Sequence, residues 1–187
     1  GVTLDNIDDG AIEYFLDHAI GEGRMEPESR KSSKEEVLSN LGLIKNGIPT
    51  NGAVLLFGKY PQRRFVTSSF KIGRFGADDA DLLNQDQIEG NLIQMTDKIM
   101  QVLSSKYLIR PIHYEGLQRK EPLEIPEDAL REIIFNSIVH KLQFGTWNQM
   151  SIYDDHIRLW NEGVLPENYT VETLMSKHTS KPRNPKM

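Results

Sequence analysis

Three polar side chains stand four residues apart in the segment PEDALREIIFNSIVH, residues 126–140. They are Glu132, Asn136 and His140, a set that we call the polar stripe. At about 3.6 residues per turn, steps of four residues keep side chains on one narrow line of a helix. A carboxylate accepts protons and hydrogen bonds, whereas an amide and an imidazole can both donate and accept. The spacing therefore predicts a helix that directs three hydrogen-bonding side chains toward one specific target.

Apolar residues surround the polar stripe on the other sides of this predicted helix. They are Ala129, Leu130, Ile133, Ile134, Phe135, Ile138 and Val139. A helix at the protein surface would show a wide polar face, so this pattern predicts a buried helix. Pro126 suits a first helical turn, and the acidic Glu127 and Asp128 complement the helix N-terminus.

Five further segments carry the apolar spacing or the capping residues of helices. Ser32 with Glu35 and Ser33 with Glu36 both fit the Ser-x-x-Glu capping pattern, so either serine can begin the second helix. We expect helices over residues 8–21, after the capping serines, from Thr50, within residues 87–109 and from near Thr170. The apolar spacing of residues 87–109 makes that helix the longest expected in the chain.

Three stretches have the patterns of strands. Residues 68–75 alternate imperfectly, as a strand can, and residues 112–124 are polar and extended in character, which predicts a single strand. Residues 148–160 predict an antiparallel hairpin with Asp154 and Asp155 as its two-residue turn. The order of elements predicts an α+β protein with a mixed helical and strand block over residues 1–118 and a second module over residues 119–187.

Length, composition and charge limit the possible functions. The 187 residues can bury one substantial core or two small ones. A net charge of −5 argues against DNA binding by this chain itself. The sequence has no cysteine, which excludes disulfides, thiolate zinc sites and a cysteine nucleophile. No apolar run reaches the length of about 18 residues that a membrane span needs, so we expect a cytoplasmic location and no membrane partner.

Three motifs occur in order: ALREIIFNSIVH, then IYDDHIRLWNEGVLPENYTVETL, then SKPRNP. With them, residues 119–187 resemble the C-terminal module of bacterial and archaeal transcription regulators described as RecG-related or divergent AAA-4 proteins. Those regulators pair the module with an N-terminal AlbA-like, or Schlafen-type, domain. The module is similar in turn to the GHKL ATPases, which include gyrase B, histidine kinases and MutL. The resemblance therefore implies the start of a GHKL-like α/β sandwich that binds nucleotide.

The resemblance implies roles for the polar stripe. In GHKL proteins a helix presents a Glu that positions or deprotonates the attacking water and, four residues on, an Asn that helps hold Mg²⁺ on the phosphates. Glu132 and Asn136 match these positions, and Mg²⁺ prefers hard oxygen ligands such as an Asn carbonyl. His140 matches a position that is basic or polar in many relatives, which implies a phosphate-side or structural role. The implied cofactors are ATP and Mg²⁺.

Further cofactor-binding residues follow from the same resemblance. Asn161 and Gly163 fall where GHKL proteins carry an Asp-x-Gly loop, whose Asp accepts a hydrogen bond from the adenine amino group. Arg183 in SKPRNP can touch phosphates or belong to a linker. The glycine-rich lid of these proteins is expected after residue 185, and the chain reads as a piece of a longer polypeptide. We expect this piece alone to be inactive as an ATPase, and weak activity only in a full-length protein.

Two functions from different classes remain open. The first is a nucleotide-binding regulatory module of a transcription regulator that binds DNA through another domain. The second is a degenerate scaffold that keeps the fold for dimerisation or partner docking and binds no nucleotide. The structural alternative for the polar stripe is that Glu132 pairs with Arg131 or Arg158 and that Asn136 caps or bridges buried backbone. A helicase is excluded, because the chain has no Gly-x-x-x-x-Gly-Lys-Ser/Thr phosphate loop.

Overall fold

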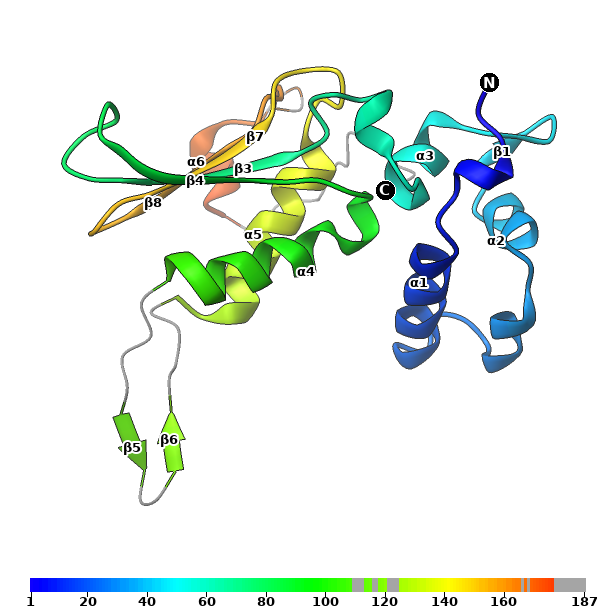
Figure 1. Cartoon of the computed structure of the whole chain (residues 1–187), viewed down its shortest axis with the longest axis horizontal. Coiled ribbons are helices and arrows are strands. Elements are labelled where there is room, and N and C mark those ends of the chain that lie inside the picture. The colour runs from blue at the N-terminus through cyan, green and yellow to red at the C-terminus, as the bar shows by residue number, and fades with distance from the viewer. Residues whose placement is uncertain (109–112, 116–117, 121–124, 166, 168, 177–187) are drawn as a thin grey trace.

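The chain has an α+β fold built around one mixed sheet (Figure 1). The computed structural model describes residues 1–108, 113–115, 118–120, 125–165, 167 and 169–176. Within these residues it has six α-helices, a four-stranded mixed sheet and two small hairpins. No helix in the described part of the chain is both long and apolar enough to cross a membrane.

The first 63 residues form a helical block. It contains the α-helices α1 Asp9–Gly21, α2 Lys34–Asn40 and α3 Asn51–Phe57, the 3-10 turns Leu4–Asn6, Pro27–Lys31 and Pro61–Arg63, and a hairpin of β1 Ile44–Lys45 with β2 Ile48–Pro49. The three predicted helices of this region are confirmed. Ser33, not Ser32, caps α2: its side chain accepts a hydrogen bond from the Glu36 backbone, and the Glu36 carboxylate accepts one from the Ser33 backbone.

The central sheet combines two antiparallel hairpins. Its strands are β3 Phe70–Phe75, β4 Leu82–Ile88, β7 Asn148–Ile152 and β8 Ile157–Trp160, in the spatial order β4-β3-β7-β8. The two hairpins join through parallel pairing of β3 with β7. In the predicted hairpin, Ile152 lies opposite Ile157 and Met150 opposite Leu159, so this prediction is confirmed.

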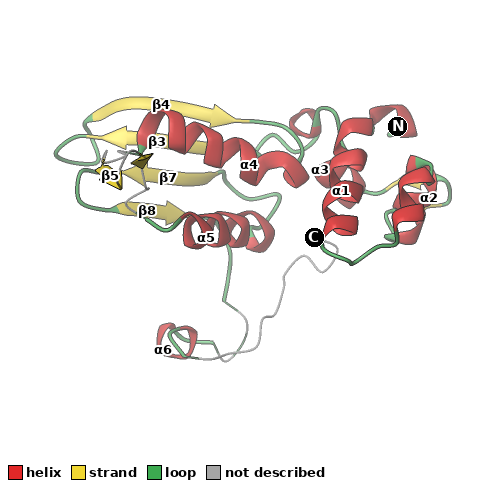
Figure 2. Ribbon diagram, turned by 90° about the horizontal axis from the view of Figure 1, so that it is seen from below, coloured by secondary structure: helices red, strands yellow, loops and turns green. Residues whose placement is uncertain are grey.

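Two helices cover one face of the sheet, as Figures 1 and 2 show. They are α4 Leu92–Val102, continued by a π-helical turn Leu103–Tyr107, and α5 Glu127–His140. Their buried residues meet the inward residues of β3 and β7 in a core that includes Phe70, Ile72, Met95, Ile99, Leu103, Leu130, Ile134, Ile138, Met150 and Ile152. The short helix α6 Val171–Leu174 begins near Thr170, as predicted, and the Thr170 side chain caps it.

The region of β4 and α4 differs from the prediction in one strand and in the form of the helix. Strand β4 was not predicted, because this edge strand is mostly polar and exposed and so shows no apolar alternation. The helix expected within residues 87–109 has 11 α-helical residues, fewer than the 14 of α5, and continues directly into five π-helical residues. Gly90, with a φ of +125°, separates β4 from the helix, and the last five residues take the wider π-helical form.

Residues 112–124 hold a hairpin where a single strand was predicted. Within the part of this range that the structure describes, β5 His113–Glu115 pairs antiparallel with β6 Gln118–Lys120. The predicted division between residues 118 and 119 stays a prediction. The central sheet takes β3 and β4 from the first range and β7 and β8 from the second.

Candidate functional site

Helix α5 is fixed to the sheet by its buried face. Leu130 and Ile134 are fully buried in this face. The Asn148 amide of β7 donates a hydrogen bond of 3.1 Å to the Ser137 hydroxyl, and that hydroxyl donates to the Ile134 carbonyl at 2.8 Å. Because these polar groups are buried and satisfied, they set the position of α5 along β7.

The polar stripe runs along the exposed side of α5. The amide nitrogen of Asn136 donates a hydrogen bond of 2.9 Å to the Glu132 carboxylate. Both side chains are exposed, and so are the neighbouring Ile133 and Phe135 at 45% and 48%. The expectation of a buried helix is therefore wrong for this side, because the sheet and α4 cover one face of α5 and leave the other open.

Glu132 has neither of the arginine partners that were considered for it. Arg131 pairs with Asp97 and Arg158 with Asp79. Glu132 instead lies at the rim of an apolar groove of about 290 Å³ between α5, α4 and α3. Leu56, Leu92, Ile93, Phe135, Ile138 and Val139 are among the residues that line this groove.

The loop after β8 is attached to the C-terminal end of α5. The Leu142 backbone donates to the Glu162 carbonyl at 2.9 Å, and the Thr146 backbone donates to the Glu162 carboxylate at 2.6 Å. A Cβ on Gly145 would lie 2.3 Å from this carboxylate, so a side chain at this position would displace the Glu162 carboxylate from its place. A Cβ on Gly163 would lie 3.5 Å from the His140 carbonyl. The structure thus brings the Asn161–Gly163 loop to the His140 end of the polar stripe.

Lys141 is a buried cation beside this loop. Its exposed fraction is 2%, and its ammonium lies 3.4 Å from the Leu142 carbonyl. Burial lowers the pKa of Lys141 to about 8, and the nearby Glu162 carboxylate opposes this shift. The sequence did not identify Lys141 or Glu162 as site residues, because the burial of Lys141 and its proximity to Glu162 depend on how the loop folds against α5.

The predicted site residues thus occupy two neighbouring places. Glu132 and Asn136 are hydrogen-bonded to one another, and Gly163 lies next to the His140 backbone. Asn161 is half-buried in the same loop. Arg183 lies outside the described residues.

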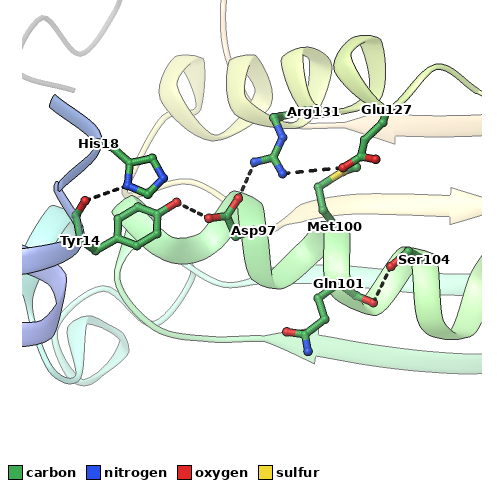
Figure 3. Close-up of a pocket in the computed structure, with 8 residues that line it drawn as sticks. All are labelled: Tyr14, His18, Asp97, Met100, Gln101, Ser104, Glu127 and Arg131. Atoms are coloured by element: carbon green, nitrogen blue, oxygen red, sulfur yellow. Dashed lines mark hydrogen bonds and ion pairs between the residues drawn. The ribbon is translucent and has the colours of Figure 1, made fainter. Parts of the chain in front are cut away.

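A second polar cluster joins α1, α4 and α5 (Figure 3). The Tyr14 hydroxyl of α1 and the Arg131 guanidinium of α5 both donate to the Asp97 carboxylate of α4. Burial alone would raise the pKa of Asp97, but hydrogen bonds from Arg131 and Tyr14 outweigh it and lower the pKa. Burial, together with the hydrogen bond to Asp97, raises the pKa of Tyr14 to about 12. At neutral pH the cluster therefore holds an ionised carboxylate and a neutral phenol.

This cluster borders a cleft of about 650 Å³. The cleft is lined by Tyr14, His18, Asp97, Met100, Gln101, Ser104, Glu127 and Arg131 (Figure 3). Sequence reasoning did not find it. A usable signal was present, since Tyr14 and His18, Asp97 and Gln101, and Glu127 and Arg131 are polar pairs at four-residue spacing. Which helices face one another was not visible in the sequence.

Comparison with known proteins gives a likeness of fold. No family model matches the chain, and no curated protein matches it. The chain is similar to the crystal structure of the DIP2311 protein from Corynebacterium diphtheriae, with a TM-score of 0.73 and 20% sequence identity. The match covers 99% of this chain and 36% of that protein, so the chain spans about a third of its length. At this identity the likeness shows the fold alone.

Proposed function

We propose that this chain contains the start of a GHKL-like nucleotide-binding module with a regulatory role, in a cytoplasmic transcription regulator of the RecG-related, divergent AAA-4 kind. One arrangement carries the proposal: the hydrogen-bonded Glu132 and Asn136 lie on the same helix whose C-terminal end adjoins the Asn161–Gly163 loop. The resemblance of residues 119–187 to that family assigns these two places to the phosphates and the adenine. The order of α5, β7 and β8 agrees with it.

The polar groups present suit a magnesium nucleotide. Asn136 donates through its amide nitrogen to Glu132, so its carbonyl oxygen faces away from that bond as a hard ligand for Mg²⁺. Bound Mg²⁺ would neutralise phosphate charge. Glu132 would accept a hydrogen bond from water, and the amide oxygen of Asn161 would accept one from the adenine amino group. His140 and Arg183 would lie on the phosphate side.

The remaining parts of the proposal concern the complete protein. DNA would be bound by another domain, and nucleotide occupancy would change how that domain acts. Hydrolysis is not proposed for this chain alone, since its polar stripe is open to solvent and water-excluded sites give the strongest charge stabilisation. A homodimer would bring two such modules together.

A scaffold without nucleotide is the second candidate, and one observation favours it. Glu132 and Asn136 satisfy one another, while Ile133 and Phe135 beside them are exposed apolar residues. Such a mixed surface suits dimerisation or docking of a protein partner. The two candidates differ in whether Asn136 contributes to ligand binding.

Calorimetric titration of Mg·ATP and Mg·ADP into this chain and into the complete gene product tests the proposal. We expect saturable binding that Asn136→Ala weakens by about tenfold or more, because a metal ligand is removed. Asn84→Ala, at an exposed position of β4, is the matched control and should bind as the unchanged protein does. Absence of binding in both folded samples would exclude the nucleotide and leave the scaffold.

A further inference from the structure

The cleft between α1, α4 and α5 lies apart from the loop at Asn161–Gly163 and carries its own polar groups (Figure 3). Its volume of about 650 Å³ is within the range of small-molecule sites, roughly 300 to 1,000 Å³. Tyr14 and His18 of α1 stand on one side, Glu127 and Arg131 of α5 on another, and α4 lies between them. Three elements thus contribute side chains to one concave surface.

The charges along the cleft favour a cation. Two carboxylates, Asp97 and Glu127, face one guanidinium, Arg131. Asp97 is held by both Arg131 and Tyr14. Glu127 is farther from the guanidinium, at 4.0 Å, and its side chain is 64% exposed. Glu127 is therefore the carboxylate with room for another positive group, whereas an anion would meet a guanidinium that already pairs with two acids.

Several hydrogen-bonding groups along the cleft can accept a hydrogen bond from a ligand. His18 Nδ1 lies 2.8 Å from the Tyr14 carbonyl, which can only accept, so Nδ1 carries a proton and Nε2 is the ring nitrogen that can accept. The Ser104 hydroxyl donates to the Gln101 carbonyl at 3.1 Å, which leaves its lone pairs to accept. Together with the Glu127 carboxylate these groups call for a ligand that is rich in N–H donors.

The cleft also has a small apolar part, which belongs to a core residue of α4. The Met100 side chain is 5% exposed and lies on α4 beside these polar groups (Figure 3). The rings of Tyr14 and His18, which both line the cleft, stack with their centroids 4.0 Å apart and their planes inclined by 28°. Ser104 lies in the π-helical turn after α4, and such turns occur frequently at functional sites. An alkyl chain can pack on the thioether and the ring edges.

We propose that this cleft binds a small alkylamine or alkylguanidine, with its cationic group at Glu127 and its alkyl chain on Met100. An ammonium supplies three N–H donors and a guanidinium five, which matches the acceptors along the cleft. The site does not depend on the nucleotide proposal, because none of its groups belongs to the polar stripe.

Titration of agmatine into the chain labelled with ¹³C in its methionine methyl groups tests this proposal. Agmatine carries a guanidinium and an ammonium on a four-carbon chain. We expect a saturable shift of the Met100 methyl signal, assigned through Met100→Leu, with a Kd at or below about 1 mM. Butyrate and butanol have the chain without the cation and should leave the signal in place.

Variants of two neighbouring acidic residues on α5 distinguish specific binding of agmatine in the cleft from a general electrostatic attraction to the acidic surface. Glu127→Gln should raise the Kd for agmatine about tenfold, because it removes the charge that the cation meets. Asp128→Asn removes the same charge from the next residue, which does not line the cleft, and should change the Kd less than about twofold. Asn136→Ala should leave agmatine binding unchanged, because Asn136 does not line the cleft. The agmatine proposal and the nucleotide proposal can therefore fail independently of one another. An unshifted Met100 signal, equal effects of the two acid variants, or equal binding of butyrate would overturn the proposal.

Discussion

Lys141 follows the C-terminal end of α5 and has almost no contact with solvent, although its side chain ends in an ammonium group. Burial disfavours the charged form, which is why its pKa falls to about 8 from an ordinary value of 10.5. Between these two values the unfolded chain binds more protons at Lys141 than the folded chain does. The free energy of unfolding should therefore rise as the pH increases from about 8 towards 10.

Lys141→Met should remove this pH dependence. The variant replaces the buried ammonium by an apolar group of similar length, so we expect unfolding at pH 7 to cost on the order of 1 to 3 kcal/mol more than in the unchanged protein. Urea unfolding at pH 7 and 9.5 measures the effect, and the gap between the two proteins should narrow at the higher pH. Lys45→Met, at an exposed position, is the control. A destabilised variant at pH 7 would show that Lys141 makes contacts worth more than its burial costs.

At the residue scale, some features of the candidate site follow from residue spacing along one helix, and others depend on contacts between elements. Four-residue spacing correctly placed Glu132 and Asn136 within hydrogen-bonding distance, because helix geometry alone sets it. Lys141 and Asp97 were not found, since their pKa shifts depend on the fold: burial lowers the pKa of Lys141, and the hydrogen bonds from Arg131 and Tyr14 lower that of Asp97. No periodicity in the sequence reports such pairs.

At the scale of the elements, a helix start is predictable from the sequence wherever a capping side chain defines it. The helices after Asp8, Ser33, Thr50 and Thr170 begin where a capping side chain accepts a backbone hydrogen bond. Strand β4 lacks such a signal: it is polar at the sheet edge, and only its pairing with β3 makes it a strand. The exposure of the polar stripe was also not visible, because periodicity does not say which face of α5 is covered.

The two adjacent serines before α2 test the capping argument. Ser33→Ala should destabilise the chain by about 1 kcal/mol, because it removes the acceptor for the Glu36 backbone. Ser32→Ala is the matched control and should change stability by less than about 0.5 kcal/mol, because Ser32 ends the preceding 3-10 turn and caps no helix. Urea unfolding of the two variants gives the comparison. Equal losses, or a greater loss at Ser32, would mean that the capping box is not what stabilises the start of α2.

At the scale of the whole molecule, β7 lies between β3 and β8. Five residues of β7 pair in parallel with β3, which comes from the other side of the predicted boundary at residue 118. Phe70 and Ile72 of β3 are also buried in the same core as Leu130 and Ile134 of α5. The sheet and its helical cover therefore depend on both ranges.

Residues 119–187 expressed alone should not fold. Without β3 the described part of the range keeps the β7–β8 hairpin, α5 and the short α6, and a single hairpin is marginally stable at best in water. The buried Met150 and Ile152 of β7 would lose the strand beside them and its part of the core. We expect narrow amide proton dispersion in the NMR spectrum of this piece, and recovery of dispersed signals when residues 1–118 are added in trans. A well-dispersed spectrum from residues 119–187 alone would instead establish the predicted module as an independent folding unit, and the β3–β7 pairing would then be a contact between two domains.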